Sequence, residues 1–453
     1  MTSESVRLDP RLPSGFRDLG PAEASAQKWM IETVCRVYES HGFVPLDTSV
    51  VEFYTTLVSG HGESGEKQIY RLCKDEVPPP DKALALRFEL TASLARYLGM
   101  HIDSLPMPFK RYQSGYVWRG ERPQRGRFRQ FLQFDVDTVG IADTAADAEI
   151  VEVIYRSFEA LGVPRFEVRL SSRSLLSGLA RVLGLATQDA QQEFFRVLDK
   201  HDKVGTETLM AILGGSADEG GLGLPAPALD LVGKVLALTG PNRDVLEEAA
   251  RLLHGPEETV RGIRELSTML DYVAAALLPH PEYVRIMPSL ARGLDYYTGP
   301  VFETFITGQE TIGSVMSGGR YDGLIGHFLG RQIPATGVSM GVDRLLVVLQ
   351  SLGLTPGAAS RCRVLVAVLS AEERPLMCGV ASALRRAGIP TETYLGDQFS
   401  FRQEIAYASQ QGIPFLLIQG ENERGRGVVA LRDLTTRQQE ETTLEAAIDK
   451  LRP

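Results

Sequence analysis

Side chains that can bind phosphate or a charged small molecule are concentrated in four short segments of the sequence. Each segment combines arginine with glycine, carboxylate or tyrosine, a mixture that core packing alone does not require. Arginine matches phosphate oxygens in pairs and stays charged at any working pH. Each segment alone has an ordinary structural interpretation, but their order and spacing together favour a binding site. The segments are LRFELT (86–91), YVWRGERPQRGRFRQFLQFDVD (116–137), RGLDYYTGPVFE (292–303), and SGGRYDGLI (317–325) followed by GVSMGVDRLL (337–346).

The second segment has the alternation of a strand. Its even positions from 128 to 136 are mostly apolar, whereas its odd positions carry Arg127, Arg129, Gln133, Asp135 and Asp137. Successive side chains of a strand point to opposite faces, so the even set predicts a core face and the odd set a polar row. A half-exposed surface explains this row most simply. The sharper hypothesis is a site for a zwitterion and a polyphosphate.

Two strands, 109–118 and 128–139, are predicted to be joined by a basic loop, and they must position this polar row. Helices are expected over 22–41, in the second half of 86–99, and over 341–352, and Gly318-Gly319 reads as a turn. Seven basic residues lie between 110 and 129, opposed within that stretch only by Glu121. The simplest interpretation of such a run is a solvated face.

The composition argues against three classes of protein: membrane proteins, secreted proteins built on disulfides, and zinc modules. The formal net charge is −9, and no apolar run approaches the ~20 residues that cross a bilayer. The four cysteines form no CxxC pair, and the N-terminus lacks the apolar segment of a secretory signal. We therefore expect a cytoplasmic protein with no membrane association and no metal site built by the protein.

The four segments together resemble histidyl-tRNA synthetases, a family of class II aminoacyl-tRNA synthetases. The stretch 116–137 is similar to the second class II motif and GVSMGVDRLL to the third, while RGLDYYTGPVFE and SGGRYDGL are similar to two segments peculiar to the histidine enzymes. The resemblance implies an α+β fold, with an antiparallel sheet flanked by helices, a helical insertion and a C-terminal α/β anticodon-binding domain. The expected limits are 1–171 and 285–353 for the two parts of the catalytic core, 172–284 for the insertion, 354–361 for a linker, and 362–453 for the C-terminal domain.

The resemblance also implies roles for individual residues. Arg119 would bind the α-phosphate of ATP and Arg344 the γ-phosphate, with Arg127 as a further ATP contact. Arg292 and Arg119 would be catalytic, and the tRNA acceptor end would meet Gln124 and Arg125. Histidine would be held by Glu89, Leu90, Thr91, Gln133, Asp137, Arg292, Tyr296, Tyr297 and Tyr321.

The activity implied is histidine–tRNA ligase: ATP converts L-histidine to its adenylate, which tRNA(His) then accepts at its 3′ end. Mg²⁺ is expected with ATP, and a homodimer is expected from the family. The alternative is a catalytically inactive paralogue, the regulatory subunit of ATP phosphoribosyltransferase in histidine biosynthesis, which typically loses catalytic residues and the C-terminal domain.

The sequence also departs from the family pattern. Ser49 stands where the first class II motif usually has a proline, which weakens the expected detail of the dimer interface. Asp137 replaces a glutamate that is common in bacterial members, and this shortens the reach to the imidazole by one methylene.

Overall fold

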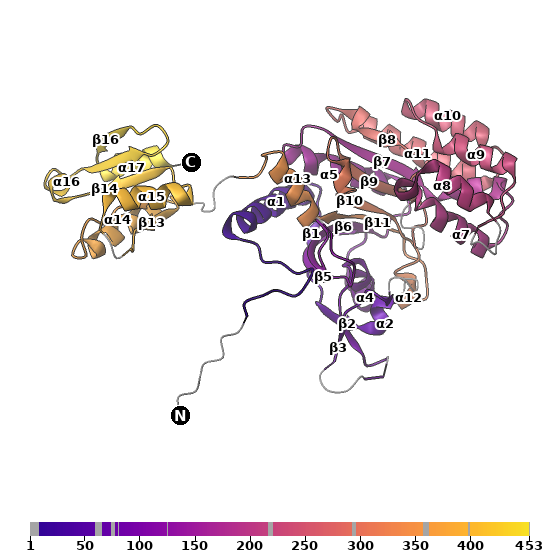
Figure 1. Cartoon of the computed structure of the whole chain (residues 1–453), viewed down its shortest axis with the longest axis horizontal. Helices are drawn as coiled ribbons and strands as arrows, with labels where there is room; N and C mark the ends of the chain where they lie inside the picture. The colour runs from indigo at the N-terminus through magenta and orange to yellow at the C-terminus, as the bar shows by residue number, and fades with distance from the viewer. Residues whose placement is uncertain are drawn as a thin grey trace. The chain divides into compact units, whose positions relative to one another are not determined.

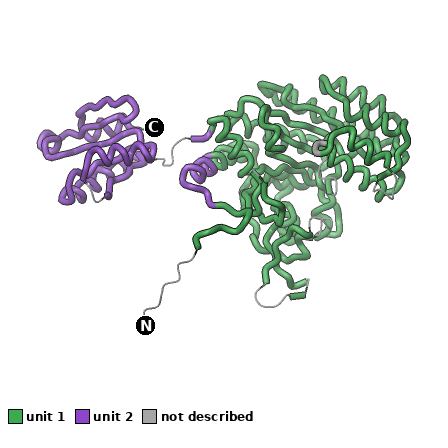
Figure 2. The backbone as a smooth tube through the Cα atoms, viewed as in Figure 1, with its two compact units in different colours: residues 1–17, 30–354 green, residues 18–29, 355–453 purple. Residues whose placement is uncertain are grey.

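The computed structural model describes residues 9–58, 66–73, 78–79, 81–124, 126–215, 221–291, 296–356, 362–396 and 399–452. The chain divides into two compact units, one formed by residues 1–17 and 30–354 and the other by 18–29 and 355–453 (Figure 2). Among the described residues, no helix is long and apolar enough to cross a membrane.

An eight-stranded sheet forms the centre of the first unit (Figure 1). Its strand order is β1-β5-β6-β11-β10-β9-β7-β8, and all neighbours are antiparallel except β1 with β5 and β7 with β8. The predicted fold class, an antiparallel sheet flanked by helices, is thereby confirmed. The strands are β1 (Val44–Pro45), β5 (Phe109–Trp118), β6 (Gln130–Val139), β7 (Phe166–Ser172), β8 (Val284–Ile286), β9 (Pro300–Ile306), β10 (Met316–Arg320) and β11 (Ala335–Gly341).

Helices cover one face of this sheet. The even residues of β6 pack there, as the ring of Phe134 lies 4.8 Å from that of Tyr38 on α1. Helix α5 packs on β6, β7, β10 and β11, and α13 packs on β6 and β11. The opposite face therefore carries the odd residues of β6. The helices are α1 (Pro21–Ser40), α5 (Ala145–Ala160) and α13 (Val342–Ser351).

Smaller elements complete the first unit. A small three-stranded sheet has the order β2 (Val51–Phe53), β4 (Leu84–Leu86) and β3 (Arg71–Leu72). Helix α2 (Tyr54–Val58) directly follows β2. Helix α4 (Thr91–His101) is followed by η1 (Ile102–Ser104), and η4 (Glu310–Ile312) and α12 (Gly326–Leu329) flank β10.

The segment predicted as an insertion is helical and lies between the parallel strands β7 and β8. Helices α6 and α11 pack against each other, and α7 to α10 follow in sequence with neighbours in contact (Figure 1). They are α6 (Arg173–Val182), α7 (Gln188–Leu198), α8 (His201–Gly214), α9 (Ala226–Leu236), α10 (Asn242–Leu252) and α11 (Glu257–Ala275), followed by η3 (Pro281–Tyr283).

One element differs from the prediction. Gly318 and Gly319 lie inside β10 and are not a turn. Both glycines are needed because neighbouring backbone is too close for a side chain: a Cβ at Gly318 would stand 2.1 Å from the carbonyl oxygen of Gly337, and one at Gly319 2.7 Å from that of Pro300. The pair of glycines marks a closely packed strand.

The C-terminal region folds as a five-stranded α/β sheet with the order β13-β12-β14-β15-β16. The first three strands are parallel, as predicted for most of this sheet, and the last two are antiparallel. The elements are β12 (Val364–Val366), α14 (Arg374–Arg386), β13 (Thr391–Thr393), α15 (Phe401–Gln411), β14 (Phe415–Ile418), α16 (Glu421–Gly425), β15 (Val429–Asp433), β16 (Gln439–Thr442) and α17 (Leu444–Leu451). Most of the predicted linker, 354–361, lies outside the described residues.

The C-terminal region contains a fully buried carboxyl group, that of Glu404 on helix α15. Its Oε1 accepts a hydrogen bond from the amide of Val368, and burial raises its pKa to about 7. Between about pH 4.5 and pH 7 the unfolded chain loses this proton while the folded chain keeps it, so stability falls as pH rises through this window. Glu404→Gln should therefore stabilise the domain by about 1–2 kcal/mol at pH 8 and by little at pH 4. Urea unfolding of both proteins at the two pH values measures this, and an equal effect at both would contradict it.

Candidate active site

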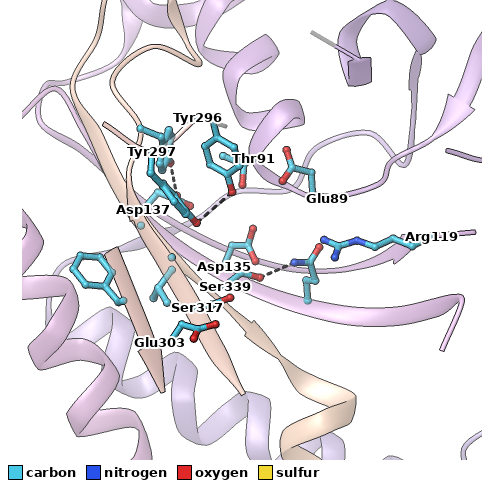
Figure 3. Close-up of a pocket in the computed structure, with 16 residues that line it drawn as sticks. Glu89, Thr91, Arg119, Asp135, Asp137, Tyr296, Tyr297, Glu303, Ser317 and Ser339 are labelled. Carbon is cyan, nitrogen blue, oxygen red and sulfur yellow. Dashed lines mark hydrogen bonds between the residues drawn. The ribbon is translucent and has the colours of Figure 1, made fainter. Parts of the chain in front are cut away.

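Most of the residues predicted to bind histidine surround one cavity of about 250 Å³ on the face of the sheet away from α5 (Figure 3). In the view of Figure 3, Tyr296 and Tyr297 lie on one side of it and Arg119 on the other, with Asp135 between them. Seven described residues of the predicted set line it: Glu89, Thr91, Gln133, Asp137, Tyr296, Tyr297 and Tyr321.

Asp137 is fixed from three directions at the base of the cavity. Tyr321 donates a hydrogen bond to its Oδ1, and Nη2 of Arg111 lies 2.7 Å from its Oδ2. On the β11 side, Gly337 stands directly opposite Asp137 in register, and a Cβ there would lie 2.0 Å from Oδ1. The carboxylate thus fills space that any other residue at position 337 would need.

Asp135 lies two residues before Asp137 on the same face and is also buried. Burial raises the pKa of Asp135 to about 7, and it raises that of Asp137 as well, while the positive charge of Arg111 opposes both shifts. Two buried carboxyl groups facing one arginine leave excess negative charge in the cavity. Such a cavity attracts a cation.

A short hydrogen-bonded chain orients the amide of Gln133. Its Nε2 donates to Oγ of Ser339 at 2.7 Å, and the Ser339 hydroxyl lowers the pKa of Asp135 by hydrogen bonding. Within the described part of the chain, Oε1 of Gln133 and Oδ1 of Asp135 are buried and accept no hydrogen bond. A buried acceptor without a donor costs about 1–3 kcal/mol, so these two oxygens suit a ligand rich in N–H groups.

Glu89, two residues before α4, and Thr91, the first residue of α4, both line the cavity. Oε1 of Glu89 accepts a hydrogen bond from the amide of Ala92 in the first turn at 3.1 Å, so this carboxylate is tied to the start of the helix and faces the cavity. The neighbouring Arg87 has a structural role, since it donates to the carbonyl oxygens of Tyr116 and Thr48 at 2.8 Å each.

A second cavity of about 160 Å³ collects the arginines predicted to bind ATP: Arg119, Arg127 and Arg344 all line it. Burial and the nearby charge of Arg127 lower the pKa of Arg344. Arg127 also pairs with Glu121 at 3.3 Å. Arginine side chains that share one cavity repel one another. A bound polyphosphate would remove this repulsion, because its oxygens would pair with each guanidinium group.

The two cavities adjoin, since four residues line both: Arg119, Gln133, Ser317 and Ser339. Two kinds of contact hold Arg119 at this junction. Its Nε donates a hydrogen bond to the carbonyl oxygen of Phe88 at 3.2 Å. Its guanidinium carbon lies 4.5 Å from the ring centre of Phe88 and 5.2 Å from that of Phe131. A molecule in one cavity and a molecule in the other would meet at Arg119.

A polar row crosses seven strands on this face. Each member stands directly opposite the next in the strand registers, and the row runs past both cavities. Its members are Gln113, Asp135, Ser339, Ser317, Glu303, Arg169 and Arg285, from β5 to β8.

Four predicted residues are not placed with the others. The side chain of Leu90 is fully buried and does not line the cavity, so a contact of this residue with histidine stays a prediction. Arg292 and Arg125 lie outside the described residues. Gln124 is exposed beside a tight turn, where its backbone pairs with that of Arg127.

The sequence interpretation gave no ligand-binding role to four residues that line the cavity: Asp135, Glu303, Ser317 and Ser339. The alternation of β6 already placed Asp135 on the polar face, so its position was a usable signal. Arg111 was grouped with a basic surface, yet it has no exposed area and lies against the carboxylate of Asp137.

Comparison with known proteins identifies the family. A family model described as Histidyl-tRNA synthetase matches residues 15–345, and one described as Anticodon binding domain matches residues 363–453. The chain belongs to the histidyl-tRNA synthetase family. The predicted membership of the class II synthetases is therefore confirmed, and with it the interpretation of the chain as a histidine–tRNA ligase.

Relatives in the histidyl-tRNA synthetase family match over nearly the full length. The histidine–tRNA ligase of Ruegeria pomeroyi is 38% identical over 450 residues, covering 95% of this chain and 90% of the relative. The crystal structure of histidyl-tRNA synthetase from Nostoc sp. is 31% identical with a TM-score of 0.86, covering 98% of this chain and all of that one. A structure described as an ATP phosphoribosyltransferase regulatory subunit/histidyl-tRNA synthetase from Bacillus halodurans shares the fold, with 21% identity, a TM-score of 0.74, and coverage of 91% of this chain and 100% of that one.

Among the described residues, no group of three or more His, Cys, Asp or Glu side chains is arranged to hold a metal ion.

Proposed function

We propose that the chain activates L-histidine with ATP, as the magnesium complex, and then transfers the histidyl group to the 3′ end of tRNA(His). The observation that carries this proposal is the pair of adjoining cavities. One cavity offers buried acceptors and excess negative charge, and the other offers three arginines. The first cavity therefore suits the positively charged ammonium group of an amino acid, and the second suits a triphosphate.

In the first cavity, the α-ammonium group of histidine is assigned to Glu89, Thr91 and Gln133. The imidazole is assigned to Asp137 and Tyr297, with Tyr296 and Tyr321 closing the pocket. An ionised carboxylate accepts from a ring N–H, and a phenol can serve the other ring nitrogen. Tyr296 and Tyr297 are linked through their hydroxyl groups at 3.2 Å, which fixes the phenol of Tyr297.

In the second cavity, Arg344 and Arg127 are assigned to the outer phosphates and Arg119 to the α-phosphate. A histidine carboxylate oxygen attacks the α-phosphorus, the bond from that phosphorus to the bridging oxygen breaks, and pyrophosphate leaves. Arg119 lies where the two cavities join and neutralises charge that develops on the α-phosphoryl oxygens. Arg292 is proposed to act at the same centre, on the strength of the family resemblance alone.

In the second step, a hydroxyl of the 3′-terminal ribose attacks the adenylate carbonyl, the histidyl ester forms, and AMP leaves. Gln124 and Arg125, in the loop between β5 and β6, are proposed to approach the acceptor end, and Gln124 is exposed there. The region 362–453 is proposed to bind the anticodon, in keeping with the matched family model.

The decisive experiment is pyrophosphate exchange with each amino acid in turn. Exchange that depends on histidine supports the proposal, and exchange with another amino acid would redirect it. Absence of exchange with every amino acid would favour the regulatory paralogue.

Removal of residues 362–453 is expected to spare histidine-dependent exchange and to reduce tRNA charging by about 100-fold or more, since anticodon contacts add affinity that the acceptor end does not supply. Exchange and charging assays on the same truncated protein test this. Unchanged charging efficiency would remove the RNA-binding role from this domain.

A homodimer is proposed, with the small three-stranded sheet as part of its interface. Phe53, Leu84 and Leu72 stand opposite one another in register on this sheet, and all three are exposed. Adjacent exposed apolar side chains mark a contact surface. The molar mass in solution, measured by sedimentation equilibrium, tests the assembly; the cytoplasmic location remains a prediction.

A further inference from the structure

Among the residues that the structure describes, Arg111 on β5 is the largest side chain that is completely buried. It stands opposite Asp137 in the β5–β6 register, and its Nη2 lies 2.7 Å from Oδ2 of that residue. It does not line the histidine cavity, so it acts on a ligand through residues that do, and Asp137 is the lining residue that it contacts. Burying an arginine is costly unless its charge is used.

The contacts of Arg111 differ from those of the structural arginines nearby. Arg87 donates to two backbone carbonyls, and Arg320 donates to the carbonyls of Ile141 and Asp143 as well as to Asp147. In the described part of the chain, none of the three guanidinium nitrogens of Arg111 makes an aligned hydrogen bond. Its contribution is therefore its charge beside a carboxylate, rather than cross-linking of the backbone.

The groups around Asp137 make this charge necessary. The carboxyl groups of Asp135 and Glu89 face the same cavity, and the phenols of Tyr296, Tyr297 and Tyr321 carry no positive charge. Tyr38 lies across the sheet, and Arg119 stands at the far side of the cavity. Arg111 is thus the cation in direct contact with Asp137 among the described residues.

We propose that Arg111 is a positioning residue for histidine recognition: its charge holds Asp137 ionised and oriented, so that the ring of the amino acid meets an acceptor. The inference rests on the proposed function of the cavity. Without Arg111, the buried carboxyl groups of Asp135 and Asp137 lose the positive charge that lowers the pKa of both, and the pair takes up a proton more readily. A protonated Asp137 loses part of its capacity to accept from the imidazole.

The test is the Arg111→Met variant, assayed by pyrophosphate exchange. The KM for histidine should rise by about 10- to 100-fold, while kcat changes by less than about 5-fold and the KM for ATP stays unchanged. Because the arginine lowers the pKa of Asp137, its loss raises that pKa. The variant should therefore recover affinity for histidine as the pH rises from about 6 to about 9, and its profile should lie at higher pH than that of the unmutated protein.

Two further variants separate this effect from a structural one. Arg111→Lys keeps the charge and should restore most of the histidine affinity. Arg111→Met combined with Asp135→Asn removes one positive and one negative charge together, and it should also recover affinity relative to Arg111→Met alone. If Arg111→Met acted by disturbing the packing of the sheet, adding Asp135→Asn would not restore the affinity for histidine.

Lys110→Met is the matched control, because Lys110 is the preceding residue of β5 but bonds to Glu149 and His41. It should leave the KM for histidine and its pH profile unchanged. The proposal is overturned if Arg111→Met leaves both unchanged, or if the double variant is no better than the single one. If Arg111→Met does not fold, Arg111→Lys and its pH profile decide. Failure of the proposed function is distinguishable, since the unmutated protein would then show no histidine-dependent exchange.

Discussion

Replacement of Arg119 by methionine is expected to lower the kcat of histidine-dependent pyrophosphate exchange by about 100- to 1000-fold. Arg119 lines both cavities, and two aromatic rings and a backbone carbonyl hold its guanidinium before any substrate arrives. A group held in place in advance stabilises developing charge without reorganising, so most of the loss should fall on kcat rather than on the KM for ATP.

Arg36→Met is a suitable control for Arg119→Met, since Arg36 is exposed on α1 and its hydrogen bonds stay within that helix. It should exchange at the normal rate. Near-normal turnover of Arg119→Met would remove Arg119 from the reacting centre. A rise in the KM for ATP with unchanged kcat would limit Arg119 to ground-state binding.

Replacement of Gly337 by alanine should have an effect of similar size by a different route. Its Cβ would lie 2.0 Å from Oδ1 of Asp137 and 2.7 Å from the carbonyl of Val136. Because Tyr321 and Arg111 already hold Asp137, the carboxylate cannot move aside without losing a partner. We expect kcat/KM for histidine to fall by about 100-fold or more, with a loss of stability of about 1–3 kcal/mol.

Gly323→Ala provides the matched control for Gly337→Ala. Gly323 lies in the connection between β10 and β11, and a Cβ at that position would meet nothing within 4 Å. Steady-state exchange with varied histidine, together with urea unfolding, measures both effects. A Gly337→Ala protein with normal histidine kinetics would show that Asp137 is free to move, and it would contradict the geometry described for the cavity.

The sequence could predict the parts of the site that depend on local pattern. The alternation of residues 128–139 placed Gln133, Asp135 and Asp137 on one face, and strand β6 confirms this. Strand β5 has the predicted limits, and the arginines of the second and third motifs share one cavity. Period and motif spacing are local properties, so they can be read without knowledge of the fold.

What could not be predicted depends on register between distant segments. Ser339 reaches Gln133 only because β11 pairs with β6, about 200 residues away in the sequence. The pairing of β5 with β6 likewise turns Arg111 from a member of a basic run into a buried partner of Asp137. Gly318-Gly319 was predicted to be a turn because the crowding that requires glycine comes from β9 and β11. Only the assembled sheet supplies these contacts.

The polar row across seven strands has a consequence for how the sequence can vary in length. Its members stand opposite one another because the hydrogen bonds between the strands fix the register. Deletion or insertion of one residue within β9, β10 or β11 would therefore turn the following side chains of that strand to the helix-covered face. Length changes in these strands should therefore be far less tolerated than point substitutions. Added or lost residues belong instead in the connections, as with the block of helices carried between β7 and β8.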